Sequence, residues 1–167
     1  MKLTEHFTLE ELTLSETAVR NGIDNTAPPG ILPRLRVLAR GLERVRRIIK
    51  RPLHINSGYR CEALERVLCA KDYAGWCARH GKDPKAAWGE YFARKMHPKG
   101  YAADFICPLF GPPLKIVRAV KKAGIKFDQL IEEGTWVHIS FDPQLRGEIL
   151  TAHFDASGTP TYTQGVG

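Results

Sequence analysis

The chain has 167 residues, of which 43% are hydrophobic and 26% are charged, and its net charge is +7 at neutral pH. This length suits one domain with its own hydrophobic core. No segment approaches the ~20 apolar residues of a membrane-spanning helix, which excludes a helical membrane protein. The positive charge predicts attraction to polyanions but does not choose among nucleic acid, anionic membranes and cell-wall polymers.

The start of the chain mixes glutamates into its apolar positions between residues 5 and 16, so we expect no secretory signal peptide there. The cysteines are expected to be free thiols, because a chain of this size folds without disulfides. Three of them are spaced eight residues apart, unlike the close pairs that hold a structural zinc. The four are Cys61, Cys69, Cys77 and Cys107.

Residues 7–14 predict a short helix, because Thr8 is followed three positions later by Glu11 in a capping-box pattern. After irregular chain over residues 21–30, apolar residues recur every three or four positions from Leu32 to about Lys50 and predict a long helix. The other face of that helix is basic. We interpret it mainly as a solvated face, with a wall-binding or nucleic-acid-binding surface as the alternative. Its basic residues are Arg34, Arg36, Arg40, Arg44, Arg46, Arg47 and Lys50, with Arg51 just beyond.

The remainder of the chain predicts short strands and helices. Strands are expected at 53–57 and 101–107, a helix at 114–122, and a hairpin of two strands around Gly134. Residues 61–95 predict two or three short helices. The segment from 154 onward is rich in Gly, Thr and Ser. We therefore predict one α+β domain over residues 1–153, with N-terminal helices packed on a small antiparallel sheet, a helical insertion at about 61–95, and a flexible tail at 154–167.

Two histidines lie beside predicted strands and are candidates for a metal site. His97 stands in a turn, and Asp104 follows seven positions later on a strand, with Gly100 allowing the reversal between them. His138, on the last strand of the hairpin, can add a third ligand if that strand neighbours residues 101–107. Two imidazoles and one carboxylate with an open fourth position form the usual ligand set of a catalytic zinc.

Three motifs resemble those of the M15 metallopeptidases, the zinc D-Ala-D-Ala carboxypeptidase and L-alanyl-D-glutamate endopeptidase group that includes phage endolysins. They are Ser57-Gly58-Tyr59-Arg60, the series His97, Gly100, Ala102 and Asp104, and Trp136-Val137-His138-Ile139-Ser140. The opening residues FTLEEL, with Ser15, Ala18 and the run Gly22-Ile23-Asp24-Asn25, are similar to small phage and prophage members. The resemblance runs from about Phe7 to Phe141 and implies a Hedgehog/DD-peptidase-like fold.

The resemblance also implies roles for individual residues. His97, Asp104 and His138 match the family's zinc ligands. Arg60 matches an arginine that faces the site and can hold a substrate carboxylate or the developing oxyanion, and Ser57 would support its turn. We expect Ser57 and Trp136 to contribute to substrate binding.

A carboxylate must also take the proton from the attacking water. Glu132 and Glu133 are the candidates, and we favour Glu133, although the sequence does not say which of them faces the metal. Several branches of the family carry an acidic residue three positions before the second histidine, where this chain has Thr135. The identity of the base is therefore open at this stage.

The sequence thus predicts a Zn²⁺-dependent peptidase that hydrolyses bonds in peptidoglycan stem peptides, trimming a terminal D-Ala or cutting the L-Ala–D-Glu bond. A non-catalytic wall-binding or virion-structural module that retains the fold is the alternative, and a nucleic-acid-binding protein is a weaker one. We expect a monomer that binds stem peptides, with anionic wall polymers as a second candidate partner, and without specific nucleic acid. The resemblance to phage enzymes implies a cytoplasmic protein until its release to the wall, or a virion-associated one.

Overall fold

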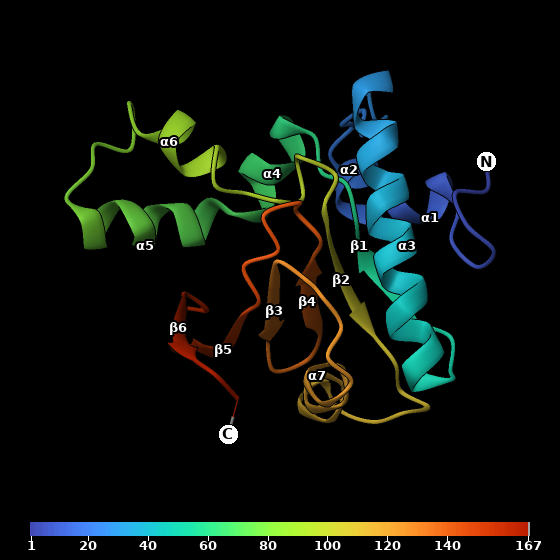
Figure 1. The fold of residues 1–167 in the computed structure, drawn as a ribbon. Coiled ribbons are helices and arrows are strands. Elements are labelled where there is room, and N and C mark those ends of the chain that lie inside the picture. Colours follow the sequence, from blue (N-terminus) through green and yellow to red (C-terminus); the bar gives the residue numbers. More distant parts are fainter. Residues whose placement is uncertain (167) are drawn as a thin grey trace.

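The computed structural model describes residues 1–166 and confirms the α+β class. Figure 1 shows the helices and strands of the chain. In chain order they are α1 (Leu9–Thr13), α2 (Glu16–Arg20), the 3-10 helix η1 (Pro29–Ile31), α3 (Leu32–Ile49), β1 (His54–Ser57), α4 (Glu62–Leu68), α5 (Ala70–His80), α6 (Trp88–Phe92), β2 (Ala102–Ile106), α7 (Pro113–Lys122), β3 (Gln129–Glu132), β4 (Val137–Ser140), β5 (Glu148–Phe154) and β6 (Pro160–Gln164).

The six strands form one sheet in the order β1-β2-β4-β3-β5-β6. Four of the five neighbouring pairs are antiparallel, but β3 and β5 run parallel. The sheet is therefore mixed, whereas a small antiparallel sheet was expected from the sequence. Strand β4 ends beside the start of β3, and the chain between β4 and β5 passes that end of β3, so β5 starts on the other side of β3 and runs in the same direction.

Alternate residues of the central strands face opposite sides of the sheet. One side is the main hydrophobic core, which packs against α3 and α7 and takes Ala103, Phe105, Leu130, Val137 and Ile139 from the sheet. The residues between them face the other side of the sheet. This second side carries the candidate metal ligands on β2 and β4.

Helix α3 packs so closely on the sheet that Gly41 is required at its contact with Phe141. A Cβ atom at Gly41 would lie 2.3 Å from the Phe141 ring. We expect Gly41→Ala to lower the free energy of unfolding by about 1–3 kcal/mol, as overpacked core substitutions do. Urea unfolding measures this loss. Gly89→Ala on α6, where an added Cβ meets no atom within 4 Å, is the control and should not destabilise. Equal stability of both variants would contradict the tight packing.

The predicted insertion at 61–95 contains three helices, α4, α5 and α6, and has a small core of its own. Figure 1 shows α5 and α6 on the side of the molecule opposite to α3. Five aromatic side chains pack against one another there, with neighbouring ring centroids 5.0–6.3 Å apart. They are Tyr73, Trp76, Trp88, Tyr91 and Phe92. This packing makes the insertion a folded unit beside the sheet.

The segment from residue 154, expected to be a flexible tail, contains the edge strand β6. Strand β6 pairs antiparallel with β5, from Phe154↔Pro160 to Leu150↔Gln164. The Gly and Ser that predicted a tail form the turn between the two strands, and the β-branched and aromatic run Thr161-Tyr162-Thr163 forms the strand itself.

Two further features complete the fold. All four cysteines are free thiols, as expected. Within residues 1–166, no helix combines the length and the apolarity that crossing a membrane requires.

Candidate metal centre

Strand register brings the predicted ligands on β2 and β4 together. Asp104 pairs directly with His138, which confirms that β4 neighbours β2. Ser57 of β1 lies opposite Asp104 on its other side, and Ile131 of β3 lies opposite His138. Directly paired residues share one face of a sheet, so this row lies on the side away from α3 and α7.

The turn after α6 places His97 beside Asp104 and His138. Its backbone closes through a hydrogen bond from Gly100 N to His97 O of 3.0 Å, and Gly100 has a φ of +76°, which favours glycine. A Cβ atom at Gly100 would also lie 2.7 Å from Ile31. His97 is 5% exposed, Asp104 7% and His138 9%, so the three side chains form a buried group.

The hydrogen bonds of His97 fix which ring nitrogen faces this group. Nδ1 donates to the carbonyl oxygen of Gly58 at 2.7 Å, because a carbonyl can only accept. Burial and the Arg60 cation lower the pKa of His97, so the ring is neutral. Its Nε2 therefore presents a lone pair to its neighbours.

Three electron-pair donors converge at this point. Nε2 of His97 lies 3.2 Å from Asp104 Oδ1 and 3.3 Å from His138 Nδ1, and the last two atoms are 2.9 Å apart. Tetrahedral zinc, with bonds of about 2.0–2.1 Å, holds neighbouring ligand atoms about 3.3 Å apart. The lone pair of neutral His97 facing a carboxylate oxygen is repulsive unless a cation lies between them. The residues therefore fit a divalent metal in both spacing and charge.

Arg60 holds the carboxylate of Asp104 from the other side. Its Nη2 donates to Asp104 Oδ2, while its Nε donates to Ser57 Oγ at 2.8 Å. Although burial opposes the effect, neighbouring groups, the Arg60 cation among them, hold the pKa of Asp104 well below its usual range. Asp104 is therefore ionised, with Oδ1 directed to the histidines and Oδ2 to Arg60. Ser57 contacts Arg60, as the prediction that it supports this turn requires.

Glu133, and not Glu132, continues the face of the sheet that carries the donors. Glu133 stands two positions after Ile131, the residue opposite His138, whereas Glu132 pairs with Val137 on the core-facing row. Glu132 instead accepts a hydrogen bond from Gly134 N at 2.9 Å. Burial, together with the Asp104 carboxylate, raises the pKa of Glu133 to about 7 against the opposing influence of His138. A carboxylate of this pKa near the donors suits proton transfer at neutral pH.

Trp136, predicted to bind substrate, lies on the hairpin between Glu133 and His138. Its ring packs near Phe154 of β5, with centroids 6.3 Å apart. Its indole N–H is buried and makes no hydrogen bond within residues 1–166. Trp136 also contributes to lowering the pKa of Glu133, against the larger effect of burial.

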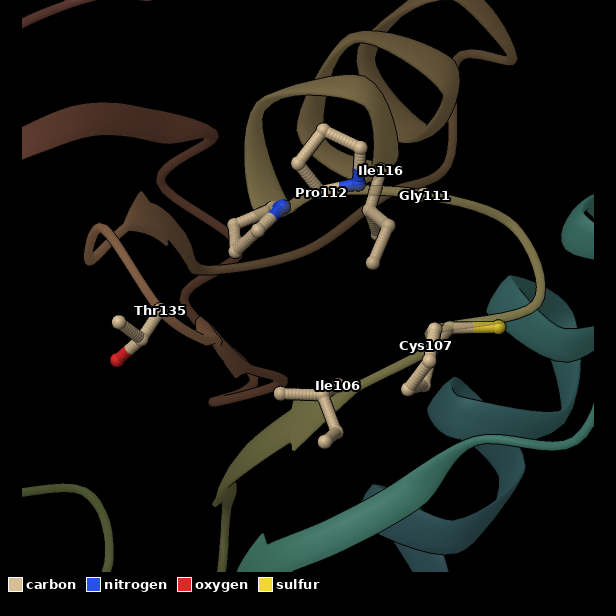
Figure 2. Close-up of a pocket in the computed structure, with 8 residues that line it drawn as sticks. Ile106, Cys107, Gly111, Pro112, Ile116 and Thr135 are labelled. Atoms are coloured by element: carbon tan, nitrogen blue, oxygen red, sulfur yellow. The ribbon is translucent and has the colours of Figure 1, made fainter.

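A cavity of about 420 Å³ lies at the end of β2 (Figure 2). Figure 2 shows Ile116 and Pro112 of the α7 region facing Ile106 of β2 across this space. Ile106 follows Asp104 by two positions, and Thr135 lies on the hairpin turn between Glu133 and His138. None of the residues lining the cavity is a candidate metal ligand, so the cavity does not contain the donor group.

Comparison with known proteins supports the resemblance seen in the motifs. Residues 5–70 match the family model described as Peptidase M15. No curated protein matches the chain. The matched segment contains Ser57 and Arg60 and ends before the three candidate ligands, which the structure brings beside Arg60 independently of that match. The match covers less than half of the chain, and over residues 5–70 the chain is similar to the Peptidase M15 family.

Proposed function

We propose that this protein is a zinc-dependent peptidase that hydrolyses peptide bonds in the stem peptides of peptidoglycan. The observation that carries the proposal is the convergence of three lone-pair donors, from His97, Asp104 and His138, next to a carboxylate with a raised pKa. The family match supports peptidase activity. The choice of wall peptides rests on the resemblance to M15 enzymes of that kind.

Metal binding, proton transfer and substrate contact are assigned to different residues. His97, Asp104 and His138 would hold the zinc, which lowers the pKa of a water molecule and polarises the scissile carbonyl. Glu133 accepts the proton of the attacking water at its carboxylate and passes it to the departing amine. Arg60 keeps Asp104 oriented. Because its three hydrogen bonds do not use all of its N–H groups, it can also donate to a substrate carboxylate or oxyanion.

Mass spectrometry of digested peptidoglycan tests this function. Purified peptidoglycan of several chemotypes is incubated with zinc-loaded protein, and chelated protein is the control. We expect new peptide termini with the loaded protein alone, and their masses distinguish release of D-Ala from cleavage between L-Ala and D-Glu. Intact peptidoglycan of every chemotype, with zinc verified in the protein, would reject the hydrolase and favour a non-catalytic wall-binding or virion module.

The basic face of α3 supports a second part of the proposal, adsorption to anionic wall polymers. Arg36, Arg40 and Arg47 are exposed and lie along one side of the helix. The resemblance to small phage enzymes extends the proposal to a protein that reaches the wall after release from the cytoplasm, or as part of a virion. A cationic face would then concentrate the enzyme on its insoluble substrate.

Replacing Arg36, Arg40 and Arg47 together by glutamine should weaken binding to walls that carry anionic polymers several-fold at low salt. The difference should shrink as salt rises, because exposed charges are screened. Pelleting with isolated walls measures the bound fraction, and hydrolysis of a short soluble peptide is the control that should not change. Equal pelleting of both proteins at low salt would refute a role for this face.

A further inference from the structure

A buried carboxylate outside the donor group connects the helical insertion to the metal centre. Glu65 lies on α4, the first helix of the insertion, and is 0% exposed. Its Oε2 accepts from Arg60 Nη1 at 3.5 Å, and its Oε1 accepts from the thiol of Cys69 at 3.0 Å. A buried acidic side chain is costly unless it is paired, and the partner of Glu65 is the arginine that holds Asp104.

The guanidinium of Arg60 therefore lies between two carboxylates. Nη2 donates to Asp104 Oδ2, and Nη1 donates to Glu65 Oε2. Asp104 and Glu65 raise the pKa of Arg60 despite its burial, so its charge is permanent. With one nitrogen engaged by each carboxylate, Arg60 contacts only one oxygen of Asp104. The other oxygen, Oδ1, remains directed at His97 and His138.

Without the charge of Glu65, the two terminal nitrogens of Arg60 would no longer be shared between Asp104 and Glu65. An arginine facing a single carboxylate favours the bidentate arrangement, in which two N–H groups bind both carboxylate oxygens. Rotation of Arg60 into that arrangement would take Oδ1 of Asp104 away from the histidines. Groups behind a metal ligand commonly alter metal affinity in this way, by about 10–100-fold.

We propose that Glu65 is a positioning residue of the metal centre, which acts through Arg60 to keep Oδ1 of Asp104 available to the metal. The inference rests on the proposed function, because it assumes that Asp104 is a ligand. Helix α4 of the insertion would then take part in metal binding, because it carries Glu65, the residue that orients Arg60.

Zinc affinity, measured by competition with a chelator, tests the inference on the folded full-length chain. Glu65→Gln keeps the size of the side chain and removes its charge, and should weaken zinc binding about 10–100-fold. Glu62→Gln is the matched control. Glu62 lies in the same helical turn, is half exposed, and accepts from Arg66 and Trp88, each at 2.8 Å. This control should bind zinc like the wild type.

The double variant Arg60→Gln/Glu65→Gln separates positioning from a general loss of structure. If Glu65 acts through Arg60, adding Glu65→Gln to Arg60→Gln should weaken zinc binding no further. Further weakening, or wild-type affinity in Glu65→Gln, would overturn the inference. Thermal unfolding of the zinc-free proteins establishes that each variant is folded. Absence of zinc binding in the wild type would instead reject the proposed function, so the two failures are distinguishable.

Discussion

Glu133→Gln should lower kcat for stem-peptide hydrolysis by about 10²–10⁴-fold, the usual contribution of a general base. Glutamine preserves the shape of the side chain but cannot accept a proton from water. Zinc binding should persist, because Glu133 is not one of the three donors. Steady-state hydrolysis of a synthetic stem peptide, together with metal analysis of the same samples, measures both quantities.

Glu132→Gln is the matched control for this prediction. Glu132 is the adjacent residue, and it accepts a hydrogen bond from Gly134 N in the hairpin turn. The amide oxygen of glutamine can still accept that bond, so kcat should change little. A large loss of kcat in Glu132→Gln with a small loss in Glu133→Gln would show that the opposite carboxylate is the base.

His138→Ala should lower zinc affinity by more than about 100-fold, which exceeds the effect of removing a residue behind a ligand. The substitution removes one of the three converging donors and leaves Asp104 Oδ1 without the contact at 2.9 Å. Elemental analysis after gel filtration should find zinc in the wild type and almost none in the variant. Peptide hydrolysis should be lost with the metal.

His153→Ala provides the histidine control for the metal experiment. His153 lies on β5, is exposed, and its Nε2 contacts Thr163 Oγ1 at 2.9 Å, away from the donor group. This variant should keep both zinc and activity. Retention of zinc in His138→Ala, or its loss in His153→Ala, would contradict the assignment of the centre.

Local sequence signals predicted most of the helices and strands. The capping pattern at Thr8 and Glu11 is present as a hydrogen bond from Glu11 N to Thr8 Oγ1, and the long helix ends at Ile49, with Lys50 in the left-handed conformation. Helix α2 was missed, since five residues carry too little periodicity to predict a helix. Its signal is Ser15, whose side chain accepts from Ala18 N as an N-cap.

Strands β5 and β6 were not predicted, and the parallel direction of β5 was not predictable from local pattern. Whether a strand joins its neighbour parallel or antiparallel depends on where the preceding loop crosses the sheet, which no short pattern encodes. The edge strand contains polar and aromatic residues flanked by Gly and Ser, and its hydrogen bonds to β5 stabilise it. From its composition alone, such a segment is predicted to be a tail.

The candidate ligands could be picked out from their positions beside strands and from the family motifs, and the structure brings them together. Their roles as ligands remain predictions. The choice between Glu132 and Glu133 needed the register of β3 against β4, because a shift by one residue exchanges the two faces. Glu65 was not predicted, since a charged residue on a helix is ordinarily exposed, and only its burial against Arg60 identifies it.

Titration of zinc into the metal-free protein, with bound metal and hydrolysis of a synthetic stem peptide followed in the same samples, tests the central claim most directly. We predict that activity appears with the first equivalent of zinc and saturates with it, and that the products identify one cleaved peptide bond. Full activity in the metal-free protein, or one bound equivalent of zinc without hydrolysis, would contradict a zinc peptidase centred on His97, Asp104 and His138.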